Sequence, residues 1–212
     1  MKGTRTIITG MALVLALAVA SAAASYAADF SLASPAISGS AEVGFDSGLS
    51  SAGRIDARYA AKADGPANSK SFPFTWSDVP AGTKALALIF DDPDARLVLL
   101  SRGIKAPAFL HWTVADIDPS LGGLPADASQ SPSFTFVQGK NGGGQVGYRG
   151  PQPPADFPPN TGKRLIHIYR LSVFALSAPT GLKNGYSVDE LRQAMQGKVI
   201  GEARLNISYS ND

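Results

Sequence analysis

The stretch KALALIFDD, residues 84–92, is the most informative part of the sequence for predicting the fold. Six consecutive apolar residues are followed by two aspartates, and turn residues precede the stretch. An apolar run of this length between turn residues is typical of a strand that is buried on both faces. Two further apolar runs, FLHWTVADI at 109–117 and LIHIYRLSVFAL at 165–176, predict strands in the same way. Residues 199–209 alternate apolar and polar side chains, which predicts a fourth long strand.

The segments outside these strands are richer in turn residues. We expect an edge strand in residues 28–51, a short strand at the start of residues 53–71, and strands over 72–76 and 134–137. Residues 139–159 are rich in glycine and proline, so we expect irregular structure there. The 22 glycines and 15 prolines of the chain favour many turns over long helices.

One helix is predicted, over residues 187–196. Ser187 and Glu190 have the spacing of a capping box, an apolar stripe follows them, and Gly197 comes after the last turn. Because strands dominate and the helix comes late, the sequence predicts a mostly antiparallel β-sandwich with one C-terminal helix.

Composition restricts the classes of protein to which the chain can belong. Hydrophobic residues make up 44% and charged residues 17%, which is a globular composition. The 19 basic and 17 acidic residues nearly balance, so we do not expect a nucleic-acid binder. The absence of cysteine excludes disulfides, cysteine nucleophiles and metal centres with cysteine ligands. The chain also lacks the G-x-S-x-G elbow of serine hydrolases and the H-E-x-x-H pattern of zinc proteases.

The first 27 residues have the pattern of a secretory signal peptide. Two basic residues precede an apolar stretch, and the small residues Ser25 and Ala27 predict cleavage before Ala28. The alternative is an uncleaved membrane anchor, but the apolar stretch is short compared with the roughly 20 residues of a spanning helix. We therefore expect a single domain over residues 28–212, periplasmic or secreted, with no stable membrane insertion after cleavage.

Polar residues gather near the ends of the long predicted strands. Asp92 and Asp94 leave the first of them, and His111 lies within the second. His167 and Tyr169 are two residues apart on the third, so they face the same side of the sheet. Each has a common structural alternative, because aspartates fix turns and a lone histidine in an apolar strand is often a hydrogen-bonded core residue. The chain has only two histidines, and a buried imidazole needs a polar partner, which favours a shared site.

Four short motifs follow one another along the chain. They are W…VPAGTK…AL…DPDA at 76–95, the pair His111-Trp112, GYRGPQPP at 147–154 and HIY at 167–169. Together they resemble the motifs of the phosphatidylethanolamine-binding protein family, in its bacterial Raf-kinase-inhibitor-like branch.

This resemblance implies a Greek-key antiparallel β-sandwich with one C-terminal α-helix and a small anion pocket at one end. It implies no cofactor and no catalytic residue. Imidazole and phenol groups can donate hydrogen bonds to phosphate or carboxylate oxygens, and neighbouring carboxylates can orient and charge the imidazoles. The positions that the resemblance places around the pocket are Asp92, Asp94, His111, Pro153, His167 and Tyr169.

The chain departs from the family motifs at several positions. Arg96 stands where the family motif continues after DPDA with proline, and Gln152 stands where bacterial members often have cysteine. Ile168 stands where the family motif HRY has arginine. Residues 96–108 form a longer and more apolar segment than the family pattern. We therefore expect one rim of the pocket to differ.

These observations favour a non-enzymatic binding protein that holds a small anion or a phosphorylated headgroup and modulates a protein partner of unknown identity. The alternative is a metal-dependent or acid/base hydrolase that uses His111, His167 and Asp92. A third interpretation makes both histidines structural and the protein a β-domain scaffold.

Overall fold

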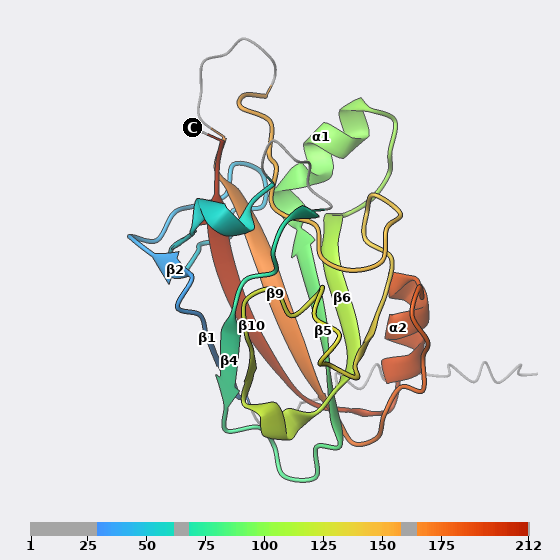
Figure 1. The fold of residues 1–212 in the computed structure, drawn as a ribbon. Helices are drawn as coiled ribbons and strands as arrows, with labels where there is room; N and C mark the ends of the chain where they lie inside the picture. Colours follow the sequence, from blue (N-terminus) through green and yellow to red (C-terminus); the bar gives the residue numbers. More distant parts are fainter. Residues whose placement is uncertain (1–28, 62–67, 158–164, 212) are drawn as a thin grey trace, which may run out of the picture.

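The computed structural model describes residues 29–61, 68–157 and 165–211, and its strands form two sheets (Figure 1). The larger sheet has the strand order β2-β3-β10-β9-β5-β6-β8, and the smaller has the order β1-β4-β7. All described strand pairs are antiparallel except β3 with β10. The predicted signal peptide lies outside the described residues. The strands are β1 (Ser31–Ala33), β2 (Ile37–Ser38), β3 (Arg54–Ile55), β4 (Phe74–Ser77), β5 (Ala85–Asp92), β6 (Phe109–Ile117), β7 (Gly123–Leu124), β8 (Val137–Gln138), β9 (His167–Leu176) and β10 (Val199–Tyr209).

The predicted β-rich fold is confirmed, and β5 is an interior strand of the larger sheet. This strand pairs with β6 on one side and with β9 on the other, and all eight of its residues are buried. The continuous apolar run of the sequence thus corresponds to a strand that is covered on both faces. The other three long strands also form where the sequence predicts them.

The two faces of the larger sheet are covered by different parts of the chain. The main core lies between the larger sheet and the smaller one, where Phe74 and Trp76 of β4 meet Phe90 of β5 and Trp112 of β6 in one buried cluster. On the other face, α2 (Val188–Met195) places Leu191 and other apolar side chains against the outward-facing residues of β5 and β6. Figure 1 shows α2 alone at one side of the sheet.

Helix α2 begins as the sequence predicts. The Ser187 hydroxyl accepts a hydrogen bond from the Glu190 backbone N–H, and the Glu190 carboxylate accepts one from the Ser187 N–H. This reciprocal pair satisfies two of the donors that a helix N-terminus leaves free.

The structure adds a second short helix, α1 (Arg96–Ser101), in the apolar segment that departs from the family pattern. It continues directly from the 3₁₀ turn Pro93–Ala95, so the turn supplies the first helical residues. Val98 and Leu99 are its buried residues. The helix lies at the same end of the molecule as the described C-terminal residues (Figure 1).

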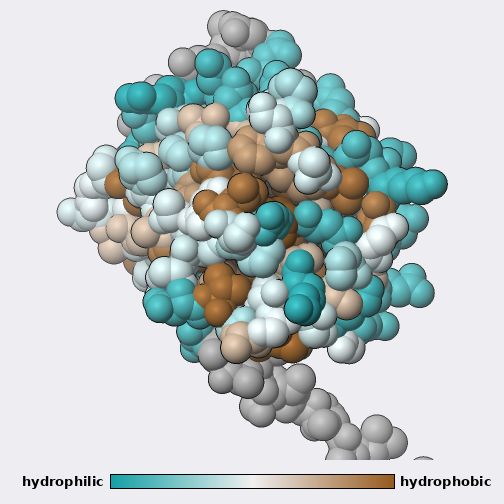
Figure 2. Space-filling model, turned by 60° about the horizontal axis from the view of Figure 1, so that its bottom comes forward, coloured by the Kyte–Doolittle hydropathy of each residue, from teal (hydrophilic) through white to brown (hydrophobic). Residues whose placement is uncertain are grey.

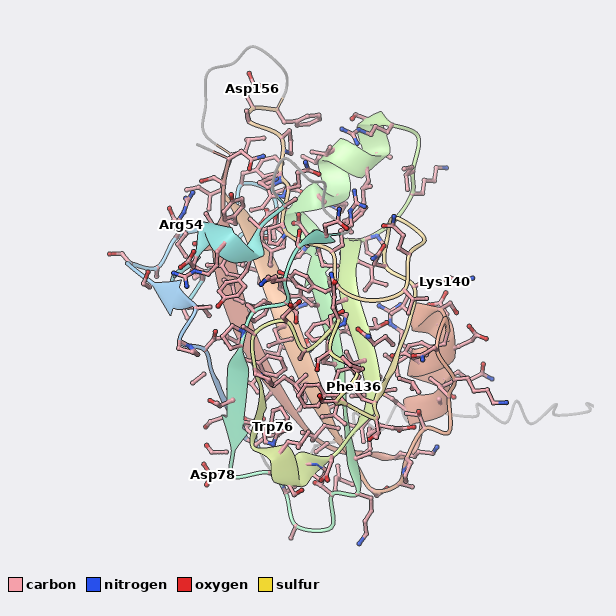
Figure 3. The ribbon with its side chains drawn as sticks, viewed as in Figure 1. Arg54, Trp76, Asp78, Phe136, Lys140 and Asp156 are labelled. Carbon is pink, nitrogen blue, oxygen red and sulfur yellow. The ribbon has the colours of Figure 1, made fainter. Side chains whose placement is uncertain are left out.

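The predicted strand over residues 134–137 is wrong at its start. Only Val137 and Gln138 pair, with β6. The rings of Phe134 and Phe136 instead stack on each other with centroids 5.4 Å apart, which packs this segment as a loop. Figure 3 places Phe136 and Trp76 toward one end of the molecule and Asp156 at the other, which is the end that carries the pocket described below.

The face shown in Figure 2 has no single large hydrophobic patch. On the face shown in Figure 2, hydrophobic residues lie in separate patches between hydrophilic ones. Within the described ranges, no helix has the length and apolar character needed to cross a membrane.

Candidate functional site

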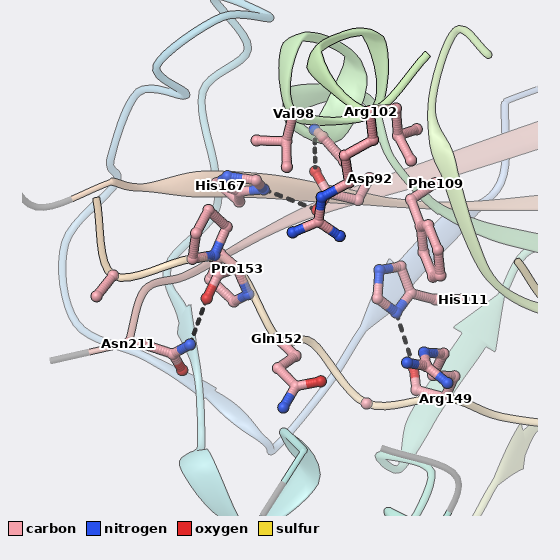
Figure 4. Close-up of a pocket in the computed structure, with 15 residues that line it drawn as sticks. Asp92, Val98, Arg102, Phe109, His111, Arg149, Gln152, Pro153, His167 and Asn211 are labelled. Carbon is pink, nitrogen blue, oxygen red and sulfur yellow. Dashed lines mark hydrogen bonds and ion pairs between the residues drawn. The ribbon is translucent and has the colours of Figure 1, made fainter. Parts of the chain in front are cut away.

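Strand order brings three of the predicted site residues together at one end of the larger sheet, where neighbouring strands begin and end. Asp92 ends β5, while His111 lies near the start of β6 and His167 begins β9. Because both neighbours run antiparallel to β5, the end of β5 meets the starts of β6 and β9. A pocket of about 400 Å³ lies there, and its lining includes all three residues (Figure 4).

Asp92 and His167 form a buried pair in this pocket. The His167 Nδ1 atom lies 2.8 Å from Asp92 Oδ2, and the two side chains are 1% and 4% exposed. The other carboxylate oxygen of Asp92 accepts a hydrogen bond from the Ala95 backbone N–H, at 3.0 Å. The carboxylate therefore fixes the imidazole with its Nδ1–H directed at Asp92. The Nε2 atom of His167 is buried and has no hydrogen-bond partner among the described residues.

His111 is held from a different side. Its Nδ1 atom lies 2.8 Å from the Arg149 backbone oxygen. Burial lowers the pKa of His111 to about 4, although the nearby Asp92 charge opposes this shift. At neutral pH the ring is uncharged, so Nδ1–H donates to the carbonyl and Nε2 carries a lone pair. The expectation that both imidazoles donate to an anion is therefore wrong for His111 at neutral pH.

Tyr169 lies behind the two imidazoles and is not part of the pocket lining. The side chain is fully buried, and its ring centroid is 5.1 Å from that of His111 and 6.3 Å from that of His167. Burial and the negative charge of Asp92 raise the pKa of Tyr169 well above its usual value, so the phenol keeps its proton. Its hydroxyl is buried and lies near the Asp92 carboxylate.

Asp94 also lies outside the pocket lining, contrary to the resemblance. Its side chain is completely buried, and both carboxylate oxygens accept hydrogen bonds from other segments. They accept from the backbone N–H groups of Asp46, Ser47 and Ile168 and from the Ser47 hydroxyl, at 2.6–2.8 Å. The carboxylate is therefore directed away from the pocket.

Pro153 does line the pocket, as part of the segment that follows Arg149. It is buried, and its carbonyl accepts a hydrogen bond from the Asn211 side chain. Asn211 lines the pocket as well, so the C-terminal segment closes one of its sides.

Two arginines in the lining were not predicted as site residues. Arg102 follows α1 and Arg149 lies in the GYRGPQPP motif, and neither forms an ion pair with any residue that the structure describes. Figure 4 shows Arg102 entering from the side of α1 and Arg149 from the opposite side. The Arg149 guanidinium also lies 5.7 Å from the centre of the Phe109 ring. Arg149 could have been predicted as a site residue, because it lies in the GYRGPQPP motif. Arg102 could not, because its position depends on α1, a helix that the sequence did not predict.

The charge of the lining follows from these residues. It contains two guanidinium groups and one carboxylate, and the carboxylate is already hydrogen-bonded to His167 and Ala95. The pocket therefore offers cationic donors to a negatively charged group. Among the described residues, no group of three His, Cys, Asp or Glu side chains is arranged to hold a metal ion. The hydrolase alternative stays a prediction.

Comparisons with known proteins agree on one family. Residues 46–210 match the model of the phosphatidylethanolamine-binding protein family. A UPF0098 protein of Methanothermobacter thermautotrophicus is 36% identical over 156 residues, which cover 72% of this chain and 88% of that protein. A UPF0098 protein of Aquifex aeolicus is 37% identical over 139 residues, 65% of this chain and 72% of that protein.

Two solved structures have the same fold. One is CT736 of Chlamydia trachomatis, described as a homologue of phosphatidylethanolamine-binding protein. It gives a TM-score of 0.66 at 27% identity, and the match covers 87% of this chain and 99% of the CT736 chain. YbcL of E. coli, described as a member of the mammalian family, gives a TM-score of 0.66 at 25% identity and covers 87% of this chain and 100% of its own. With the family model matched over most of the chain, the protein belongs to the phosphatidylethanolamine-binding protein family.

Proposed function

We propose that the protein binds a small anion, in particular a phosphorylated group, in the pocket at the end of β5. One observation carries the proposal: two guanidinium groups line a pocket whose single lining carboxylate is already engaged by His167 and Ala95. A phosphoryl group offers several acceptor oxygens and negative charge, which match guanidinium donors.

A buried polar atom at the pocket supports the same ligand class. The Nε2 atom of His167 is buried and has no hydrogen-bond partner among the described residues. Buried polar groups are normally hydrogen-bonded, and orphaned ones are often found where a ligand acts. Affinity is expected to be modest, because a small anion has few atoms with which to make contacts.

Calorimetric titration tests this proposal with three probes: inorganic phosphate, glycerol phosphate and glycerophosphoethanolamine. Arg102→Gln should weaken the binding of phosphate about tenfold, because a charge-assisted hydrogen bond becomes a neutral one. Lys105→Gln is the matched control, since Lys105 belongs to the same segment but lines a neighbouring groove instead of this pocket.

The three probes separate the sources of the phosphoryl group. Preference for glycerophosphoethanolamine would indicate a lipid headgroup, and preference for glycerol phosphate would indicate a free phosphomonoester. If none of the probes binds to the wild-type protein, the proposed function is wrong.

We also propose that the protein works outside the cytoplasm, in the periplasm or as a secreted protein. The basis is the basic and apolar N-terminal sequence with small residues before Ala28. N-terminal sequencing of the exported protein should begin at or near Ala28. Retention of the protein in the cytoplasm with Met1 in place would contradict the proposal.

A further inference from the structure

The buried carboxylate of Asp94 holds a loop from a distant part of the chain. We call residues 44–47 the strap. Asp94 Oδ1 accepts hydrogen bonds from the backbone N–H groups of Asp46, at 2.7 Å, and Ser47, at 2.6 Å. Asp94 Oδ2 accepts from the Ser47 hydroxyl and from the Ile168 N–H, both at 2.8 Å. One carboxylate thus links the strap to β9, at the residue next to His167.

Two other contacts fasten the strap. The Phe45 N–H donates to the Ile166 backbone oxygen at 3.1 Å. Arg96 lies 2.9 Å from the Asp46 carboxylate, and it is the residue that replaces the proline of the family motif. The departure at position 96 therefore adds an ion pair between α1 and the strap.

The strap carries an aromatic ring onto the site. The Phe45 ring stacks on the His167 imidazole, with centroids 5.2 Å apart and planes 29° from parallel. Phe157 packs edge-on against Phe45, with its centroid 6.5 Å away. One face of the His167 ring is therefore covered by Phe45, while its Nδ1 is bound to Asp92.

We propose that Phe45 is part of the binding site, and that Asp94 is a positioning residue that holds Phe45 on His167. Stacking shields the imidazole from water and fixes the plane of the ring, so the ring does not have to be ordered when an anion binds. Hydrogen bonds to the ligand are then made in surroundings of low dielectric constant, where they are stronger. The inference rests on the proposed anion binding and assigns to it two residues outside the pocket lining.

Phe45→Leu is the direct test, with Phe134→Leu as its matched control. Both phenylalanines are half-buried and each stacks on one other ring, but Phe134 lies in the loop before β8 and stacks on Phe136. Phe45→Leu should raise the Kd for inorganic phosphate about fivefold, which is within the range of aromatic pairs. Phe134→Leu should leave this Kd unchanged, and Phe45→Trp, which keeps an aromatic cover, should restore it.

The imidazole signals report the contact between Phe45 and His167 directly, apart from any effect on affinity. The chain has two histidines, so its NMR spectrum contains two sets of ring signals. Phe45→Leu and Asp94→Asn should both shift the signals of His167, because the stacked ring is lost or displaced, and leave those of His111 in place. In the wild-type protein, cross-relaxation between the Phe45 and His167 rings should be visible with and without phosphate, which tests the contact even if a variant does not fold.

The outcomes distinguish this inference from the proposed function. If wild-type protein binds phosphate and Phe45→Leu binds it with equal affinity, the inference is wrong and the proposed function stands. Absence of ring-to-ring cross-relaxation in the wild-type protein also overturns the inference. If the wild-type protein binds neither inorganic phosphate nor glycerol phosphate nor glycerophosphoethanolamine, the proposed function fails and the inference fails with it.

Discussion

The Nδ1 atom of His167 lies 2.8 Å from the Oδ2 atom of Asp92, although the two residues are 75 positions apart in the sequence. The pair joins the end of β5 to the start of β9 and is almost completely buried. Charged groups taken out of water need partners, and here each side chain is a partner of the other. The pair is therefore both a part of the pocket and a support of the fold.

Asp92→Ala should lower the free energy of unfolding by about 3 kcal/mol, because removal of one partner leaves the other buried and unpaired. Urea unfolding at neutral pH measures this loss. The matched control is Asp189→Ala, which removes an exposed ion pair with Arg192 on α2 and should cost less than about 1 kcal/mol. Equal losses in the two variants would show that burial of the Asp92 pair does not matter.

Stability should fall between about pH 6.5 and pH 4 because of His111. Its pKa is lowered by burial from the ordinary 6.5 to about 4, so in this range the unfolded chain takes up a proton that the folded chain does not. Proton uptake by the unfolded state destabilises the fold as pH decreases, by roughly 3 kcal/mol over this range. The stabilising contribution is complete above pH 6.5 and is lost toward the folded pKa.

Urea unfolding of wild-type protein and His111→Gln at several pH values measures this effect. Glutamine can still donate to the Arg149 carbonyl but does not titrate, so the variant should lose most of the pH dependence. The pKa of Asp91 is raised by burial, which acts in the opposite direction as pH decreases, but it is common to both proteins. Equal slopes for the two proteins would contradict the assignment.

The sequence predicts the long strands well because buried strands consist of continuous or alternating apolar residues. Residues 109–117 and 199–209 form β6 and β10 with the predicted bounds. Helix α1 was not predicted because it has only six residues, and its apolar run RLVLLS has no polar face to mark a helical period. Its start depends on the preceding 3₁₀ turn and not on a cap of its own.

The site is less predictable than the fold because its details come from distant segments. Family motifs place Asp92, His111 and His167 together, and strand order explains why they meet. The same motifs do not show that Asp94 serves the strap, because its partners are 47 and 48 positions earlier in the chain. Arg102 was missed for the same reason as α1, the helix that it follows.

Gly44→Ala tests the fit of the strap around Asp94. A Cβ atom at Gly44 would stand 2.2 Å from Asp94 Oδ2 and 2.6 Å from the Ser47 hydroxyl oxygen, so the strap has to move. Overpacking of this kind typically costs about 1–3 kcal/mol. We expect the variant to melt at a lower temperature and to show shifted His167 ring signals in its NMR spectrum.

Gly48→Ala is the control for this substitution. Gly48 has a φ of +65° and no atom within 4 Å of an added Cβ, so alanine there strains the backbone without a clash. It should lower stability by about 1 kcal/mol and leave the His167 signals unchanged. If both variants shift the His167 signals equally, the contact with Asp94 does not determine the position of the strap.

The uncharged state of His111 predicts a preference for phosphate over sulfate. Its Nδ1–H is committed to the Arg149 carbonyl, so at pH 6 the Nε2 atom can only accept a hydrogen bond. Phosphate at this pH carries a P–OH group that can donate to Nε2, whereas sulfate carries no proton and places an oxygen lone pair against it. Phosphate should bind more tightly than sulfate at pH 6 and at pH 8, because both HPO4²⁻ and H2PO4⁻ keep a P–OH group and His111 is uncharged at both pH values, and calorimetric titration of both anions measures the difference. In His111→Gln, whose amide can donate to sulfate, the preference for phosphate should shrink by about tenfold, the usual size of one hydrogen bond that changes from mismatched to made. Equal binding of the two anions by the wild-type protein at pH 6 would show that His111 does not meet the ligand through an unprotonated Nε2.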